Sequence, residues 1–341
     1  MTKNSYSNVN DNTPVLVGNS QLTDKRGIEG FNYLEILTEV SKKAIIDCES
    51  STKLDDHIDT VAVIRFVADT PHRDSATSNL WGYPNMPRSL SNSLNLSPSN
   101  EIYTTTGGNS PQIALNELAN RIKDNQIDCA LLAGGEALDT FVGRLKDGLE
   151  VNWEDNPGGE PELIGKSVDG TNDHEKLHGL FDPSSVYPLF ANALRNEYGQ
   201  SIEEHMQDTG ELFENFSKVA SKNKYAWFPT HRSAEEIAEV KPENRMIGLP
   251  YTKYMNSIMR VNQSCAMVMM SAKKARDLGI PESKWIFMYS GSCINDIWNV
   301  SDRINYHSSP AIKSCTDSVF ELANISVDQV DFIDLYSCFP S

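Results

Sequence analysis

The sequence of 341 residues is poor in positive charge. It contains 30 Lys and Arg against 47 Asp and Glu, so its formal net charge at pH 7 is -17. This excess argues against non-specific binding to nucleic acid or to an anionic membrane, because both need a basic surface. The net negative charge is still compatible with a small anionic ligand bound at a local basic patch. The sequence also lacks an apolar run of about 18 residues, so we expect no transmembrane helix.

Cysteine is scarce as well. The six cysteines stand mostly inside apolar runs, without the spacing of a metal site or a disulfide framework. Reduced thiols in a cytoplasmic protein are the simplest interpretation. The N-terminus, MTKNSYSNVNDNTP, lacks the apolar core of a signal peptide, and we expect residues 1–13 to be a disordered tail. No nucleotide-binding glycine motif occurs, since AGGEAL lacks the required spacing.

What the chain does contain is an alternation of apolar strands and amphipathic helices. Three times a predicted helix is followed by Ile-Asp or Val-Asp at the start of an apolar strand, in HIDTVAVI (57–64), QIDCALLAG (126–134) and QVDFIDLYS (329–337). Near-continuous apolar strands between helices favour a mixed or parallel sheet with helices on both faces. Because the pattern occurs in both halves, it indicates an internal duplication.

The remaining elements follow from periodicity and from turn residues. The predicted strands are 14–22, 57–66, 100–106, 126–138, 284–293 and 329–339; the predicted helices are 32–48, 110–125, 183–199, 201–223, 233–240 and 308–325; residues 257–280 pass from an apolar run into a helix; and residues 67–100 and 139–182 are predicted to be long loops. The last strand stops just before Ser341 with no covering element after it. We therefore expect the sequence to be C-terminally truncated.

The turn TTTGGNSPQ (104–112) is the most distinctive candidate site. Ser110-Pro111 is typical of a helix start, where Ser caps a free backbone N–H and Pro loses none. Gly107 and Gly108 permit a positive φ or a close backbone approach. Such a turn directs several N–H groups and the positive helix end at one point, which suits a carbonyl oxygen, a thioester or a phosphate. The alternative interpretation is an ordinary strand–helix turn with a capping Ser.

From Pro14 to Phe339 the order of motifs resembles the thiolase superfamily, and more closely the sterol-carrier-type thiolases and the bacterial thiolase-like acetyl-CoA acetyltransferases. LLAGGEAL (131–138) resembles the family's Ala-Gly-Gly-x-Glu segment, residues 256–280 resemble the start of its C-terminal half, and residues 308–339 resemble the approach to its Asn-Glu-Ala-Phe or His-Asp-Cys-Phe loop. The resemblance implies an α/β fold of two duplicated βαβαβαββ halves in a five-layered α-β-α-β-α arrangement with an inserted loop domain. The implied domains are residues 14–255, with the loop domain at about 139–250, and an incomplete second half at 256–341.

Carried over residue by residue, the resemblance places the family's nucleophilic Cys on Gly108, which cannot be acylated. Ser110 lies two positions further on, but a Ser without a neighbouring base is a weak nucleophile. Tyr336 stands where the family has Asn, and Cys338 falls where the sterol-carrier type also has Cys. The resemblance thus implies a remodelled active-site turn. We also expect the turns at 107–110, 134–136 and 336–339 to converge on one pocket.

The ligand implied by the resemblance is an acyl-CoA thioester, with no tightly bound cofactor. The basic and aromatic stretch 216–233, with Lys224 and Arg232, is a candidate for holding CoA phosphates by charge and adenine by stacking; a solvated helix end is the alternative. His178 is expected beside the acyl-CoA tail, and Ser257 and Arg260 are weaker candidates. His174 and His178 have helical spacing, but no third ligand for a metal is evident.

These interpretations lead to two functional hypotheses. The first is a thiolase-like acyltransferase that acts on or binds acyl-CoA thioesters. The second is a non-catalytic acyl-CoA-binding or scaffold protein that partners a small hot-dog-fold or lipid-transfer protein. The resemblance further implies a homodimer in which the strand EIYTTT (101–106) pairs with its own copy, and its β-branched residues suit such pairing.

Overall fold

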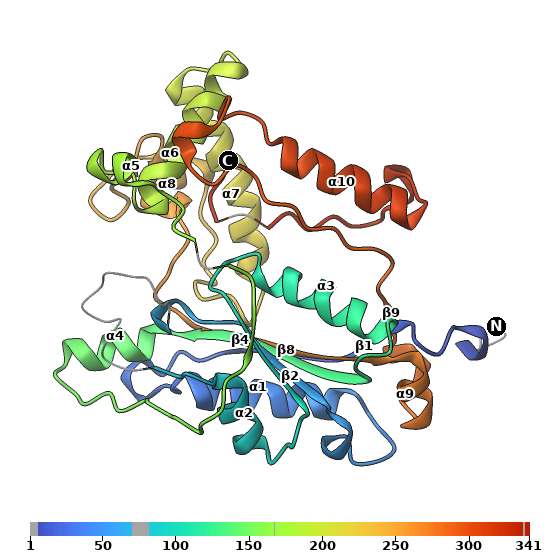
Figure 1. The fold of residues 1–341 in the computed structure, drawn as a ribbon. Helices are drawn as coiled ribbons and strands as arrows, with labels where there is room; N and C mark the ends of the chain where they lie inside the picture. Colours follow the sequence, from blue (N-terminus) through green and yellow to red (C-terminus); the bar gives the residue numbers. More distant parts are fainter. Residues whose placement is uncertain (1–5, 70–81, 167, 337) are drawn as a thin grey trace. The chain divides into compact units, whose positions relative to one another are not determined.

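A computed structural model describes residues 6–69, 82–166, 168–336 and 338–341 of the chain (Figure 1). The described residues divide into two compact units. Unit 1 comprises Met1–Ser167 and Arg260–Gly291, and unit 2 comprises Val168–Met259 and Ser292–Ser341. The predicted boundary at residues 255 and 256 separates the two duplicated halves implied by the resemblance. The division into compact units does not test it, so it stays a prediction.

Unit 1 is built on a mixed sheet of seven strands in the order β5-β3-β2-β4-β8-β1-β9. The strands are β1 (Pro14–Thr23), β2 (Thr60–Val63), β3 (Asn100–Thr104), β4 (Cys129–Ala137), β5 (Glu162–Ile164), β8 (Asn262–Ser271) and β9 (Ile286–Phe287). β2 is parallel to β3 and β4, and β3 is parallel to β5. β8 is antiparallel to both β4 and β1, and β9 is antiparallel to β1. The carboxyl ends of β3 and β4 therefore lie at the same edge of the sheet.

Helices cover both faces of this sheet, as predicted (Figure 1). On one face α1 (Tyr33–Asp47) and α2 (Met86–Leu94) share a core with Val61 and Val63 of β2. On the other face α3 (Ser110–Lys123) packs with Ala62 of β2. Successive β2 residues thus serve opposite faces, as the two-residue period of a strand requires. Two shorter helices, α4 (Leu138–Lys146) and α9 (Ala272–Asp277), complete the unit.

Unit 2 is mainly helical. Its helices are α5 (Asp173–Leu177), α6 (Pro183–Glu197), α7 (Ile202–Ala220), α8 (Ala234–Ala238) and α10 (Pro310–Ala323), and β6 (Met246–Gly248) pairs with β7 (Tyr251–Thr252). Its small core contains Ile237, Tyr251 and Phe339. The 3-10 helices of the two units are Tyr6–Asn8, Gly27–Glu29, Asp55–His57, Val67–Asp69, Lys253–Met255, Glu282–Lys284, Val300–Asp302 and Val327–Gln329. In the described part of the chain no helix has the length and apolarity to cross a membrane.

The predicted elements with strong local signals are confirmed. β2, β3 and β4 lie inside the predicted strands, β1 extends one residue beyond its predicted end at residue 22, and α1, α3, α6, α7, α8 and α10 lie inside the predicted helices. The stretch 257–280 passes from β8 into α9, and Gly279 follows with a φ of 65°. Asp59, from the first Ile-Asp repeat, accepts the backbone N–H groups of Asp128 and Cys129 and so ties the start of β4 to that of β2.

Two predicted loops contain helices. α2 lies within 67–100, where Met86, Leu90 and Leu94 are buried at helical spacing and the Asn85 side chain caps the N-terminus. The prediction of a loop was wrong because six of the nine α2 residues, MPRSLSNSL, are polar or Pro. α4 and α5 fall largely within 139–182, which was also predicted to be a loop.

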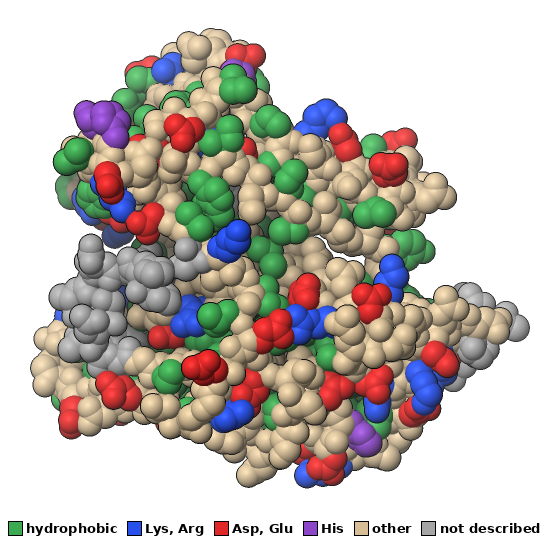
Figure 2. Space-filling model, in the orientation of Figure 1, with side chains coloured by type: hydrophobic (Ala, Val, Ile, Leu, Met, Phe, Trp, Pro, Cys, Tyr) green, Lys and Arg blue, Asp and Glu red, His purple; other side chains and the backbone are tan. Residues whose placement is uncertain are grey.

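Two predicted strands are largely absent from the structure. The strand at 284–293 shortens to Ile286–Phe287, and residues 330–336 have no strand assignment. Phe332 and Leu335 in that segment are exposed, as is much of α10, where apolar side chains reach the surface (Figure 2). A strand needs a neighbour for its backbone groups, and the described part of the chain provides no partner strand here.

The expected disordered tail, residues 1–13, is packed from Tyr6 onwards. The Tyr6 ring stacks on Trp285 with centroids 5.8 Å apart, and Arg276 donates to the carbonyl groups of Tyr6 and Val9. These contacts bring the segment onto α9 and the start of β9, so composition alone misjudged it. Residues 1–5 lie outside the described part.

Candidate active-site turn

The turn between β3 and α3 contains two of the predicted site residues, Gly108 and Ser110. Asn109 is the N-cap of α3, and Ser110 is its first helical residue. The Ser110 hydroxyl donates to the carbonyl oxygen of Thr105 at 2.7 Å, and Ser110 is only 4% exposed. Ser110 is therefore not the capping residue that we predicted. Its hydroxyl instead ties the helix start to the end of the preceding strand, buried away from solvent.

Gly108 and Asn109 form the exposed part of the turn. Their backbone N–H groups have no hydrogen-bond partner within the described residues, and Pro111 has no N–H to offer. Gly107 does not adopt a positive φ, but a Cβ at this position would lie 2.9 Å from Oδ1 of Asn109 and 3.1 Å from Oγ of Ser110. The exposed Asn109 side chain can move away, so it is the Ser110 hydroxyl that leaves little room for a side chain at 107. The turn presents two N–H donors at the positive end of a 14-residue helix.

The turn predicted at Gly134–Glu136 is not a turn, because β4 runs on to Ala137 and these residues pair with β8 near the carboxyl end of the strand. A Cβ on Gly134 would lie 2.9 Å from Cβ of Ile64, and one on Gly135 would lie 2.6 Å from Cβ of Ser264, so both glycines permit close strand packing. The Glu136 carboxylate accepts the backbone N–H of Val67 at 2.7 Å and the Tyr33 hydroxyl at 3.0 Å. Through Glu136, the segment AGGEA (133–137) therefore joins β4 to the residues that follow β2.

The third predicted turn belongs to unit 2, and its convergence with the other two stays a prediction. The phenol oxygen of Tyr336 lies 2.9 Å from Sγ of Cys338. This hydrogen bond, together with partial burial, raises the pKa of Tyr336 to about 12. The Ser257 hydroxyl donates to the carbonyl of Cys338, and the Phe339 ring stacks on Tyr187 at 4.3 Å. Ser257 thus holds this segment within unit 2. Residue 337 lies outside the described part.

The other candidates for contacting CoA differ in how available their charges are. Arg232 is bonded to Glu236, and its guanidinium lies 4.0 Å from the Tyr254 ring. Arg260, in unit 1, forms an ion pair with Asp139 at 2.9 Å. These carboxylates already neutralise the positive charge of the two arginines, which makes both weaker candidates for binding phosphate.

Lys224 and His178 are both exposed. The Lys224 ammonium lies 4.8 Å from the Tyr225 ring. Nδ1 of His178 lies 2.9 Å from the carbonyl oxygen of His174. The described residues contain no group of three His, Cys, Asp or Glu side chains that could hold a metal ion.

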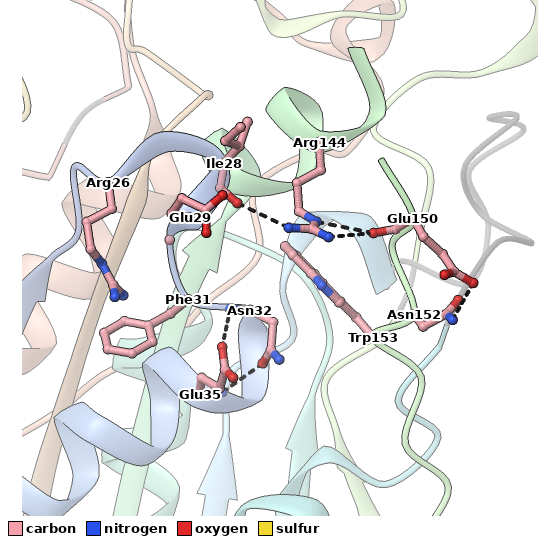
Figure 3. Close-up of a pocket in the computed structure, with 11 residues that line it drawn as sticks. Arg26, Ile28, Glu29, Phe31, Asn32, Glu35, Arg144, Glu150, Asn152 and Trp153 are labelled. Atoms are coloured by element: carbon pink, nitrogen blue, oxygen red, sulfur yellow. Dashed lines mark hydrogen bonds between the residues drawn. The ribbon is translucent and has the colours of Figure 1, made fainter. Parts of the chain in front are cut away.

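Unit 1 also contains a pocket of about 540 Å³ that sequence reasoning did not find (Figure 3). Arg144 reaches across it and donates to the carbonyl groups of Ile28 and Glu150, while Trp153 forms part of its wall. Because its lining comes from the separate segments 26–35 and 144–153, no single motif marks it. None of the predicted site residues lines this pocket.

No family model matches the chain. A curated acetyl-CoA acetyltransferase of Methanocaldococcus jannaschii is 26% identical over 165 residues, which cover 48% of this chain and 39% of that protein. A crystal structure of a monomeric SCP2-thiolase-like protein type 1 from Mycobacterium smegmatis is 32% identical, with a TM-score of 0.77, over 97% of this chain and 62% of that one. These similarities support membership of the thiolase superfamily.

Two more distant structures show the thiolase-like fold alone. The acetyl-CoA acetyltransferase from Syntrophomonas wolfei is 14% identical, with a TM-score of 0.61, over 97% of this chain and 80% of its own. The Ltp2–ChsH2(DUF35) aldolase is 16% identical, with a TM-score of 0.63, over 94% and 72% respectively. The chain spans less than two thirds of the length of both the curated relative and the mycobacterial structure.

Proposed function

We propose that this member of the thiolase superfamily binds an acyl-CoA or related thioester, with the thioester carbonyl oxygen at the turn between β3 and α3. The observation that carries the proposal is the pair of backbone N–H groups of the exposed residues Gly108 and Asn109, at the start of a long helix, which have no partner among the described residues. Preorganised backbone donors of this kind stabilise the negative charge that develops on a carbonyl oxygen. With glycine at 108, no side chain extends from the centre of the turn.

The proposed activity is acyltransferase-like, but residue 108 does not carry the acyl group. Glycine has no nucleophile, and the Ser110 hydroxyl is already bonded to the carbonyl of Thr105. The turn can polarise a bound thioester for attack by another nucleophile. The relatives named as acetyl-CoA acetyltransferases support this class of chemistry for the chain.

The alternative is a non-catalytic acyl-CoA-binding or scaffold protein that partners a small protein of lipid metabolism. Gly108 itself favours it, since the resemblance places the family's nucleophile there. The Ltp2–ChsH2(DUF35) structure offers an example in which a thiolase-like fold occurs with a second protein. A cytoplasmic location remains part of the proposal and is supported by six free cysteines, which suit a reducing compartment.

The test compares acetyl-CoA with its thioether analogue, which lacks the carbonyl oxygen, by calorimetric titration. We expect acetyl-CoA to bind more tightly. Asn109→Pro removes one N–H donor and should abolish the preference, whereas Asn109→Ala keeps the N–H and should retain it. Equal affinity of the wild type for both ligands would exclude a carbonyl site at this turn. CoA release from acetyl-CoA, followed with a thiol reagent, then separates the acyltransferase from the scaffold.

A further inference from the structure

A buried ion pair lies at the end of β2, next to β3. Nη1 of Arg65 is 2.8 Å from Oδ2 of Asp69, and the two side chains are only 11% and 13% exposed. The Tyr103 hydroxyl donates to the same carboxylate oxygen at 2.7 Å, and its ring lies 3.8 Å from the Arg65 guanidinium. Burial raises the pKa of Asp69 despite these partners. A buried ion pair is weak evidence for a stabilising role, because desolvation offsets its attraction.

This ion pair is connected to the turn by an unbroken series of hydrogen bonds within unit 1. Nε of Arg65 donates to the carbonyl of Thr104 at 3.1 Å, and the Arg65 backbone N–H donates to the Thr104 hydroxyl at 3.2 Å. The Thr104 hydroxyl donates to the carbonyl of Thr105 at 3.0 Å. The Ser110 hydroxyl donates to the same carbonyl at 2.7 Å. Two consecutive peptide groups before Gly107 are therefore held from one side by Arg65 and from the other by Ser110.

We propose that Arg65, itself oriented by Asp69 and Tyr103, is a positioning residue that sets the direction of the peptide groups in the turn at 105–110. With the carbonyl groups of Thr104 and Thr105 held, the N–H groups of Gly108 and Asn109 keep a common direction. The value of this arrangement for ligand binding rests on the proposed function. The positioning itself can be measured without any CoA ligand.

The test uses the thiol introduced by Gly108→Cys as a reporter of the N–H groups around it. A thiol at a helix N-terminus has a pKa below its ordinary value of about 8.5. We expect iodoacetamide to alkylate it with a pH midpoint at least about one unit below that value. Adding Arg65→Met or Asp69→Asn should raise the midpoint towards about 8.5, which slows alkylation at pH 7 about tenfold. Tyr103→Phe, which removes one hydrogen bond, should produce a smaller rise.

The two charge changes distinguish positioning from simple electrostatics. Loss of the positive charge of Arg65 raises a neighbouring thiol pKa, but loss of the negative charge of Asp69 lowers it. A midpoint that falls in Asp69→Asn therefore overturns the proposal. Midpoints that stay unchanged while thermal stability drops also overturn it, because they would mean that the ion pair has a purely structural role. An ordinary pKa for the thiol in Gly108→Cys alone, before a second substitution is added, overturns it as well.

Arg88→Met is the matched control, since it breaks the Arg88–Glu101 pair of the same unit at the opposite end of β3. It should leave the midpoint unchanged, and a shift as large as that of Arg65→Met would overturn the proposal. If Arg65→Met or Asp69→Asn fails to fold, Tyr103→Phe keeps the shape of the side chain and still tests the series of hydrogen bonds between the ion pair and the turn. Shifted midpoints without acetyl-CoA binding would refute the proposed function and leave the positioning role intact.

Discussion

Residue 108 determines what the turn can do. Gly108→Cys supplies a thiol beside two N–H donors, so we expect slow, stoichiometric acylation by acetyl-CoA. Efficient cleavage of acetoacetyl-CoA should not follow, because the resemblance to the thiolases aligns Tyr336 with the family's Asn. Loss of one oxyanion donor costs roughly 3 kcal/mol, or about a hundredfold or more in rate. Intact-protein mass spectrometry of wild type and variant measures the acylation. Acylation of the wild type at Ser110 or Cys338 would mean that the nucleophile was chosen wrongly.

A second prediction at the residue scale concerns His205 on α7. His205 is 9% exposed, and its Nε2 is buried with no hydrogen-bond partner among the described residues. Burial, with a contribution from Arg195, lowers the pKa of His205 in the folded chain. As the pH falls, His205 therefore takes up a proton in the unfolded chain before it does so in the folded chain. The contribution of neutral His205 to the free energy of unfolding is fully present above about pH 6.5 and is lost as the pH falls below that value.

Urea unfolding of unit 2 at pH 7.5 and 5.5 tests this prediction. His205→Gln should reduce the difference between the two unfolding midpoints. The exposed His178 provides the control, because His178→Gln should leave the difference as in the wild type. If His205→Gln shows the full pH dependence of the wild type, this histidine is not its source.

At the scale of elements, the short strand β5 is held in place by side chains rather than by its length. The Arg121 guanidinium makes two hydrogen bonds to the Glu162 carboxylate, and the Thr105 N–H donates to the carbonyl of Ile164. Gly165 then turns with a φ of 95°, where an added Cβ would lie 2.4 Å from Oγ1 of Thr105. β5 therefore depends on a glycine at its carboxyl end.

We predict that Gly165→Ala detaches β5 from β3, because the substitution combines backbone strain of about 1–3 kcal/mol with a steric clash. Faster hydrogen exchange at residues 162–165, measured by mass spectrometry, would report the detachment. Gly170→Ala is the matched control, since its Cβ would meet no atom within 4 Å. Unchanged exchange in Gly165→Ala would show that the strand tolerates the side chain.

At the scale of the whole molecule, β5 changes the expected assembly. The resemblance implied a homodimer through the strand at 101–106, but β5 already pairs with that edge of β3. We therefore expect light scattering of this 38.0 kDa chain to give the monomer mass at micromolar concentration. A dimer mass that persists in Gly165→Ala would point to a different interface.

Local pattern was sufficient for much of the fold. The buried run of β2, the apolar spacing of α1 and the Pro at the start of α3 are signals within one segment, and each produced the expected element. The glycine turn after β3 was also found this way, since strand end, glycines and helix start are adjacent. α2 was missed because burial of Met86, Leu90 and Leu94 against distant segments outweighs its polar composition.

The details that decide chemistry depend on contacts between separate segments. Only the folded chain brings the Ser110 hydroxyl to Thr105, sets Asp69 against Tyr103 and lays β5 along β3. The strand predicted at 329–339 fails for the same reason, because a strand exists only with a neighbour to pair with. Helices close their hydrogen bonds within one segment, so each helix predicted from local pattern is present, although α2, α4 and α5 were missed. Strand pairing, hydroxyl orientation and buried ion pairs are properties of tertiary contact.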